Sequence, residues 1–117
     1  MDASEHAQLA LAWLAVSDEE FAEGKRMQAS EKLWGATAHA LTAVAMERGW
    51  KYGRHRDYVI TAQRLVEEAE DDEMAECFYE ARQFHANFYQ NFLRDEDIAY
   101  SRPRVHEFAL KVLTFLE

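Results

Sequence analysis

Hydrophobic residues recur at spacings of three and four along most of the chain, which is the pattern of amphipathic α-helices. The most regular stripe lies in the second half of the chain and consists of Met74, Phe78, Ala81, His85, Phe88 and Phe92. Near the amino end, Leu9 and Trp13 belong to a similar stripe, and Asp2 and Glu5 precede it at the spacing of a capping box. These patterns predict a first helix that begins at Asp2 or Ser4 and a fourth helix that carries the aromatic stripe.

The segment between Gly24 and Gly49 is predicted to be a second helix, from about Lys25 to Arg48. One of its faces carries Trp34 and Leu41, and another carries Leu33, Ala40 and Val44. A helix that is apolar on two faces has to be covered from two sides. We therefore expect this helix to lie in the middle of a bundle.

The remaining segments are separated by short polar stretches. An irregular connection is expected from Gly49 to Arg56, followed by a third helix from Asp57 to Ala69 and an acidic link from Glu70 to Glu73. The last helical segment contains Pro103, whose missing amide hydrogen predicts a kink or a break there.

Composition agrees with a helical fold. The chain has 117 residues with 49% hydrophobic residues, which suits one hydrophobic core. Only 4 glycines and 1 proline are present, whereas a β-sandwich or barrel needs many turns built from such residues. We predict a single all-α domain over residues 1–117, an up-and-down helical bundle of four to five helices.

The charge balance limits the choice of partners. There are 13 basic and 22 acidic residues, which gives a formal net charge of −9. Such a surface disfavours general attraction to DNA or to an anionic membrane, although it leaves room for a local basic site. The longest strongly apolar stretch, Ala7 to Val16, is too short to span a bilayer, so no membrane association is expected. The single cysteine and the lack of a leader pattern favour the cytoplasm.

Metal chemistry is not indicated by the five histidines. In di-iron carboxylate bundles, a glutamate three residues before a histidine supplies the second ligand. The residues at that position are Ala3, Ala36, Tyr52, Arg82 and Pro103, and none of them can do so. We expect no metal and no cofactor.

The connection after the second helix is the first candidate binding site. Arg48, Lys51, Arg54 and Arg56 place four cations within nine residues, with His55 among them. Cations interleaved with aromatic rings suit phosphates and stacked bases. The structural alternative is that these side chains cap the second helix and pair with the glutamates of the third.

The second candidate lies on the predicted fourth helix. Arg82, His85 and Tyr89 occur at positions i, i+3 and i+7, so they share one face. His85 interrupts the apolar stripe, and we expect it to be buried, neutral and hydrogen-bonded to a Tyr or Asn of another helix or subunit. The alternative is a catalytic role for Arg82 and His85.

Five segments of the chain are similar to a known group of proteins: Ala29-Ser-Glu-Lys-Leu-Trp-Gly-Ala36, Ala40 to Ala45, Gly49-Trp50, His55, and His85-Ala-Asn-Phe-Tyr89. With these segments the chain resembles the HEPN superfamily and, close to it, the archaeal PaREP-type helical proteins. The resemblance covers most of the chain. It implies a HEPN-like helical bundle that forms a homodimer and associates with nucleotides or RNA in toxin–antitoxin or defence systems, together with a partner protein of the nucleotidyltransferase type.

The resemblance also implies an alternative function, metal-independent endoribonuclease activity. In active HEPN ribonucleases, an Arg and a His stand near the start of the late helix with a longer gap than the two residues between Arg82 and His85. Arg48 and His55 have a longer gap but lie elsewhere in the chain. Because of this departure we expect a binding or accessory protein rather than an enzyme. A third alternative is a structural protein-interaction module without a small ligand.

Overall fold

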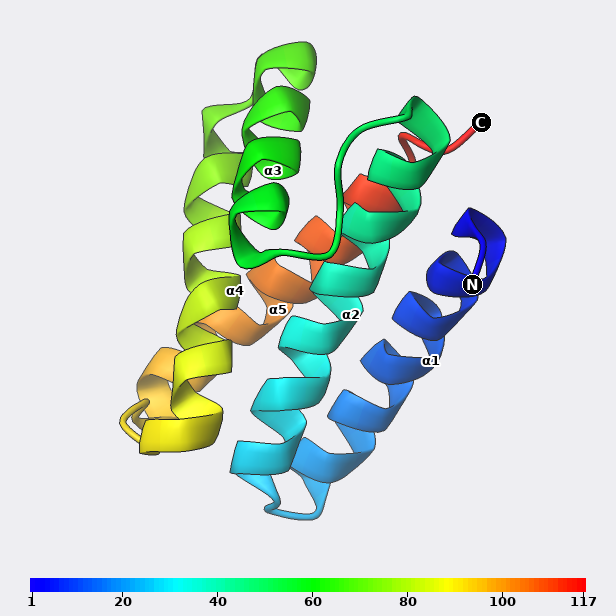
Figure 1. The fold of residues 1–117 in the computed structure, drawn as a ribbon. Helices are drawn as coiled ribbons and strands as arrows, with labels where there is room; N and C mark the ends of the chain where they lie inside the picture. The colour runs from blue at the N-terminus through cyan, green and yellow to red at the C-terminus, as the bar shows by residue number, and fades with distance from the viewer.

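Five α-helices and no strand make up the computed structural model, which describes residues 1–117. The helices are α1 (Ala3–Ala22), α2 (Arg26–Arg48), α3 (His55–Ala69), α4 (Asp72–Gln90) and α5 (Asp95–Leu113) (Figure 1). This confirms the predicted all-α bundle. None of the five helices combines the length and the apolarity needed to cross a lipid bilayer.

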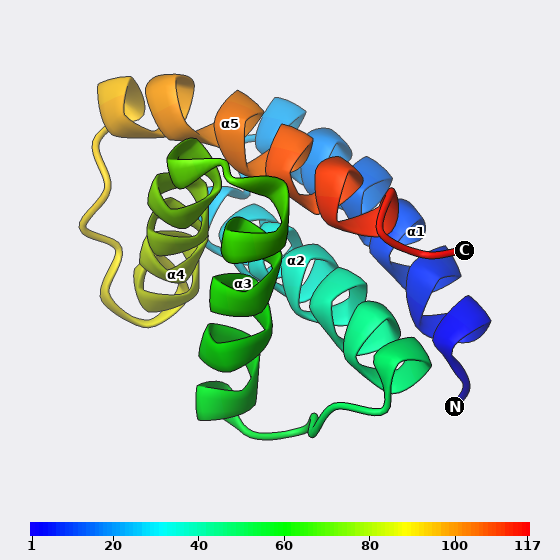
Figure 2. The same ribbon diagram turned by 90° about the horizontal axis from the view of Figure 1, so that it is seen from above.

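Helix α2 is the central element, as its two apolar faces predict. It contacts each of the other four helices, and 13 of its 23 residues are buried. Seen from above, α2 lies between α1 and α5 on one side and α3 and α4 on the other (Figure 2). The prediction that α2 occupies the middle of the bundle is therefore correct.

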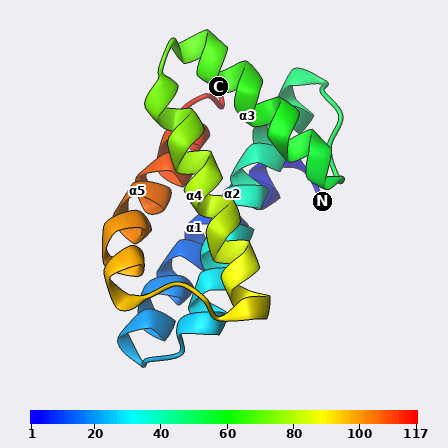
Figure 3. The same cartoon turned by 90° about the vertical axis from the view of Figure 1, so that its left-hand side faces the viewer.

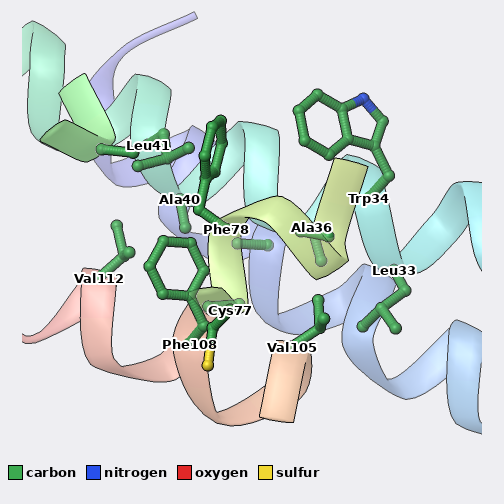
Figure 4. Close-up of a cluster of buried hydrophobic side chains, with 14 of the residues drawn as sticks. Leu33, Trp34, Ala36, Ala40, Leu41, Cys77, Phe78, Val105, Phe108 and Val112 are labelled. Atoms are coloured by element: carbon green, nitrogen blue, oxygen red, sulfur yellow. The ribbon is translucent and has the colours of Figure 1, made fainter. Parts of the chain in front are cut away.

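The core forms where α2, α4 and α5 meet (Figure 4). Leu41 of α2, Phe78 of α4, and Phe108 and Val112 of α5 are all buried there. Trp34 is only 6% exposed and belongs to the same cluster. Figure 3 shows α3 inclined to α4 at the edge of this core. Trp34 thus belongs to the core and also contacts residues of α3 at the edge of the core.

The helix ends are set by local chemistry. Gly49 ends α2 with a φ of 71°, in the left-handed region that glycine adopts without strain. Helix α3 begins at His55, two residues before the predicted start, and the Asp57 carboxylate accepts a hydrogen bond from the Arg54 amide. Helix α4 begins at Asp72, so the predicted acidic link is shorter than expected.

Of the two predicted outcomes at Pro103, a kink or a break, the break does not occur. The helix runs from Asp95 to Leu113 with the proline inside it. A proline deprives the carbonyl four residues earlier of its amide partner. That residue is Ala99, which is exposed, so water can hydrogen-bond to the free carbonyl. The helix therefore continues through Pro103 with one backbone hydrogen bond fewer.

The buried face of α4 differs from the predicted stripe at its carboxyl end. Phe84 and Asn87 are fully buried, whereas His85 is at the edge and Phe92 lies beyond the helix and is 45% exposed. The Asn87 side chain donates to Ser30 Oγ at 3.1 Å and accepts from the Leu93 amide at 2.8 Å. These bonds explain the burial of Asn87, because both of its polar ends have partners.

Candidate functional site

The Trp34 indole is the centre of a cluster of rings contributed by three helices. The centroid of its ring lies 5.2 Å from that of His85 on α4, 5.9 Å from that of His55 on α3 and 5.7 Å from that of Tyr58 on α3. Tyr89 continues the cluster outward, with its ring 5.5 Å from His85. We call these five residues the Trp34 cluster.

His85 is held by a carboxylate on α2. Its Nδ1 atom lies 2.9 Å from Oε1 of Glu31. A carboxylate oxygen only accepts, so Nδ1 carries the hydrogen, and in a neutral ring Nε2 is left as an acceptor. The predicted bond across the bundle exists, but its partner is Glu31 rather than a Tyr or Asn. The side chain of His85 is 36% exposed instead of buried.

Arg82 and His55 lie beside this histidine. Burial lowers the pKa of His55, and the nearby charges of Arg82 and His85 lower it further. Arg82 is exposed on α4, and its guanidinium carbon lies 6.0 Å from the Phe78 ring centroid. The fold therefore brings His55 of α3 close enough to Arg82 and His85 of α4 for their charges to act on it.

Arg82 is one of six cationic side chains that form no ion pair. Seven of the 13 Lys and Arg residues pair with carboxylates. The six without a carboxylate partner are Lys32, Lys51, Arg54, Arg56, Arg64 and Arg82. Arg54 and Arg56 flank His55, and both are exposed, as is Lys51 in the connection before them. Three of the six, Arg54, Arg56 and Arg82, thus lie next to residues of the Trp34 cluster.

Arg48 does not belong to this group, although it is one of the four cations of the predicted binding site. Its guanidinium Nη1 lies 2.7 Å from Oε2 of Glu68, and Nη2 donates to the Phe115 carbonyl at 3.4 Å. Glu68 lies thirteen residues along α3 from His55, a distance of about 20 Å along the helix axis. For Arg48, the structural alternative is correct: it ties the end of α2 to α3.

Two further histidines form a pair that the sequence analysis did not single out. Nδ1 of His6 on α1 lies 2.8 Å from Nδ1 of His39 on α2. Burial lowers the pKa of His39, and the neighbouring His6 lowers it further. No group of three or more His, Cys, Asp or Glu side chains is arranged to hold a metal ion.

The lowered pKa values of His39 and His55 predict a loss of stability in mild acid. Above the pKa of about 6.5 that an unfolded histidine has, neither state is protonated. As the pH falls below that value, the histidines of the unfolded chain bind protons, whereas His39 and His55 in the native state stay neutral to a lower pH. The free energy of unfolding therefore decreases. We expect the urea midpoint to fall between about pH 7 and about pH 5.5.

The control for this prediction is the double variant His39→Asn, His55→Asn. It should show a flatter dependence of the urea midpoint on pH over the same range, because two of the titrating groups are gone. An equally steep dependence in this variant would assign the effect to other groups.

Comparison with known proteins adds one finding. The model of the archaeal PaREP1/PaREP8 family matches residues 5–109, a span that contains the whole Trp34 cluster and the basic connection. No curated protein and no solved structure gives a match. The matched family is the archaeal one, and the wider relationship to HEPN proteins stays a prediction.

Proposed function

We propose that this chain, which belongs to the archaeal PaREP1/PaREP8 family, binds a nucleotide or a short single strand of RNA at the Trp34 cluster. Arg54, Arg56 and Arg82 would hold phosphate groups there. Tyr89, which is 68% exposed, offers a ring on which a base can stack.

The observation that carries this proposal is the concentration of unpaired cations in a chain with 22 acidic residues. A surface arginine in such a chain meets many carboxylates and normally pairs with one, as Arg48, Arg94 and Arg104 do. Arg54, Arg56 and Arg82 have no such partner and stay exposed. Phosphate is the anion best suited to several guanidinium groups at once.

The same exposure weighs against the alternative of an interaction module without a ligand. That alternative predicts that the cations of the basic connection and Arg82 pair with other groups of the chain and are inaccessible to a ligand. Of these side chains, only Arg48 forms such a pair, with Glu68. The cytoplasmic location, the nucleotidyltransferase-type partner and the toxin–antitoxin or defence role remain proposals that rest on the HEPN resemblance and on the sequence.

The test of the proposed function is the paired substitution Arg54→Ala, Arg56→Ala. Removing two phosphate-binding charges is expected to weaken binding of a short RNA oligonucleotide by about tenfold or more. It should also reduce the dependence of binding on salt, because fewer counterions are released. Fluorescence anisotropy at several salt concentrations measures both effects.

The matched control is Arg64→Ala on the same helix. Arg64 is exposed and lies 4.8 Å from the Trp50 ring, two turns or more away from Arg56. It should leave the affinity unchanged. Equal binding by wild type and the double variant, or no binding by wild type even at low salt, would contradict the proposed function.

We also propose that the protein is a homodimer. Tyr79, Tyr100 and Phe92 expose 61%, 65% and 45% of their surfaces on α4, α5 and the link between them. Large aromatic rings left exposed favour association with a second copy. Light scattering after size exclusion is expected to give twice the 13.6 kDa of one chain. The mass of a single chain over a wide concentration range would contradict this.

Metal-independent RNA cleavage is the second candidate function, and the Glu31–His85 bond favours it. A carboxylate that orients one imidazole nitrogen leaves the other to accept the proton of a ribose 2′-hydroxyl. The 2′-oxygen would then bond to phosphorus while the bond to the 5′-oxygen breaks, with water protonating the leaving 5′-oxygen and Arg82 beside the charged phosphate. Cleavage of single-stranded RNA by wild type in the presence of a chelator, lost in a stable His85→Ala variant, would establish this function.

A further inference from the structure

A groove of about 400 Å³ lies between α1 and α2 and opens onto the Trp34 cluster. Trp34, Tyr58 and His85 line it, so it shares three residues with the proposed binding site. Its volume is within the range of small-molecule pockets, roughly 300–1,000 Å³. The groove is therefore a continuation of the site toward the amino-terminal helix.

Each end of the groove carries a hydrogen-bonded histidine. Glu31, Gly35 and His39 occur at four-residue intervals and share one face of α2. Glu31 bonds to His85 at one end, and His39 bonds to His6 at the other. Eight residues separate the two ends along α2, which corresponds to about 12 Å.

Gly35 lets an indole form the wall between these ends. A Cβ atom at this position would overlap the six-membered ring of Trp13, so the ring lies directly against the backbone of α2. Trp13 also meets the His39 ring edge to face, with 4.8 Å between the ring centroids. Lys32, one of the unpaired cations, lies 5.7 Å from the Trp13 ring centroid. The groove thus combines aromatic walls with polar ends.

The His6–His39 pair has one donor and one acceptor to spare. Between their Nδ1 atoms, one ring must donate and the other must accept. In the neutral pair, the donating ring keeps a bare Nε2 that accepts, and the accepting ring keeps an Nε2–H that donates. Because the pKa of His39 is lowered by burial and by His6, this ring favours its neutral form. A nucleobase carries both ring-nitrogen acceptors and N–H donors, and it is planar.

We infer that this groove is the base subsite of the same ligand whose phosphate binds near Arg82, an inference that rests on the proposed function. The base enters between Trp13 and Trp34 and reaches the His6–His39 pair, while the phosphate stays outside at His55 and Arg82. Nucleotides are then bound in preference to sugar phosphates.

Isothermal titration with three probes tests this inference. The probes are adenosine 5′-monophosphate, ribose 5-phosphate, which lacks the base, and adenosine, which lacks the phosphate. Wild type is expected to bind the nucleotide about tenfold or more tightly than ribose 5-phosphate. His6→Ala and His39→Ala should each remove most of this preference and leave the affinity for ribose 5-phosphate unchanged. His6 is in the first turns of α1 and partly exposed, so its variant should fold even if that of His39 does not.

His106→Ala is the matched control, because His106 is a partly exposed histidine on α5 outside the groove. It should bind all three probes as wild type does. Equal binding of nucleotide and ribose 5-phosphate by wild type would contradict the base subsite and leave the phosphate site supported. The same conclusion would follow if His6→Ala kept the preference for the nucleotide. If adenosine binds as tightly as the nucleotide and ribose 5-phosphate does not bind, the groove stands and the phosphate site fails. If no probe binds, both fail.

Discussion

Replacing Trp34 with alanine is expected to lower the free energy of unfolding by about 3 to 5 kcal/mol. The side chain is only 6% exposed and packs against Phe78 in the core as well as against His55, Tyr58 and His85. Its removal would leave a cavity beneath the proposed binding surface. Because a domain of this kind is stable by about 5 to 15 kcal/mol, the loss is large, and urea denaturation followed by circular dichroism will measure it.

The controls separate this effect from the loss of an ordinary tryptophan. Trp34→Phe keeps an aromatic ring and should cost less than Trp34→Ala. Trp50→Ala removes a partly buried indole that packs on Arg48 and Arg64, and should also cost less. If Trp34→Ala unfolds at the same urea concentration as wild type, Trp34 does not link the core to the site.

Replacing Arg82 with alanine is expected to weaken nucleotide or RNA binding by about tenfold to a hundredfold without lowering the melting temperature. The side chain is exposed and forms no ion pair, so its removal breaks no bond within the fold. A charge-assisted hydrogen bond to phosphate contributes about 1.5 to 3 kcal/mol, which gives the expected range. Isothermal titration measures the affinity, and thermal denaturation checks the fold.

Two variants serve as comparisons for Arg82→Ala. Arg82→Lys keeps the charge but not the planar fork, so its affinity should fall between those of wild type and Arg82→Ala. Arg94→Ala removes an exposed arginine that already pairs with Glu96 and Asp97, and should bind as wild type does. Unchanged affinity in Arg82→Ala would exclude this side chain from the site.

The architecture could be predicted because it follows from periodicity. The two apolar faces of the segment from Lys25 to Arg48 require neighbours on both sides, and α2 contacts all four other helices. Gly24 and Gly49 both have positive φ, and they mark the ends of α1 and α2 as expected. The continuation of α5 through Pro103 could not be predicted, because helix breaking by proline depends on whether the freed carbonyl can reach water, which the sequence does not specify.

The positions of several candidate site residues could be predicted as well. His55, Arg82, His85 and Tyr89 were recognised by residue type and helical spacing, and the structure brings them together around Trp34. The pairing of Arg48 with Glu68 could not be distinguished from a free cation, because both fit the same sequence.

The carboxylate and histidine partners could not be found from the sequence. Glu31 is 54 residues from His85, and His6 is 33 residues from His39. Each partner lies on a different helix, so its spacing carries no local signal. Only the packing of α1 and α4 against α2 brings these polar groups within hydrogen-bonding distance.

The most direct test of the central claim is an NMR titration of the ¹⁵N-labelled protein with adenosine 5′-monophosphate. The predicted result is that amide shifts change around His55, Arg82 and His85. The amides around a cavity of about 690 Å³ between α4 and α5, lined by Cys77 and Lys111, should stay unchanged. No shifts at a large excess of nucleotide, or shifts confined to that cavity, would contradict a phosphate-binding site at the Trp34 cluster.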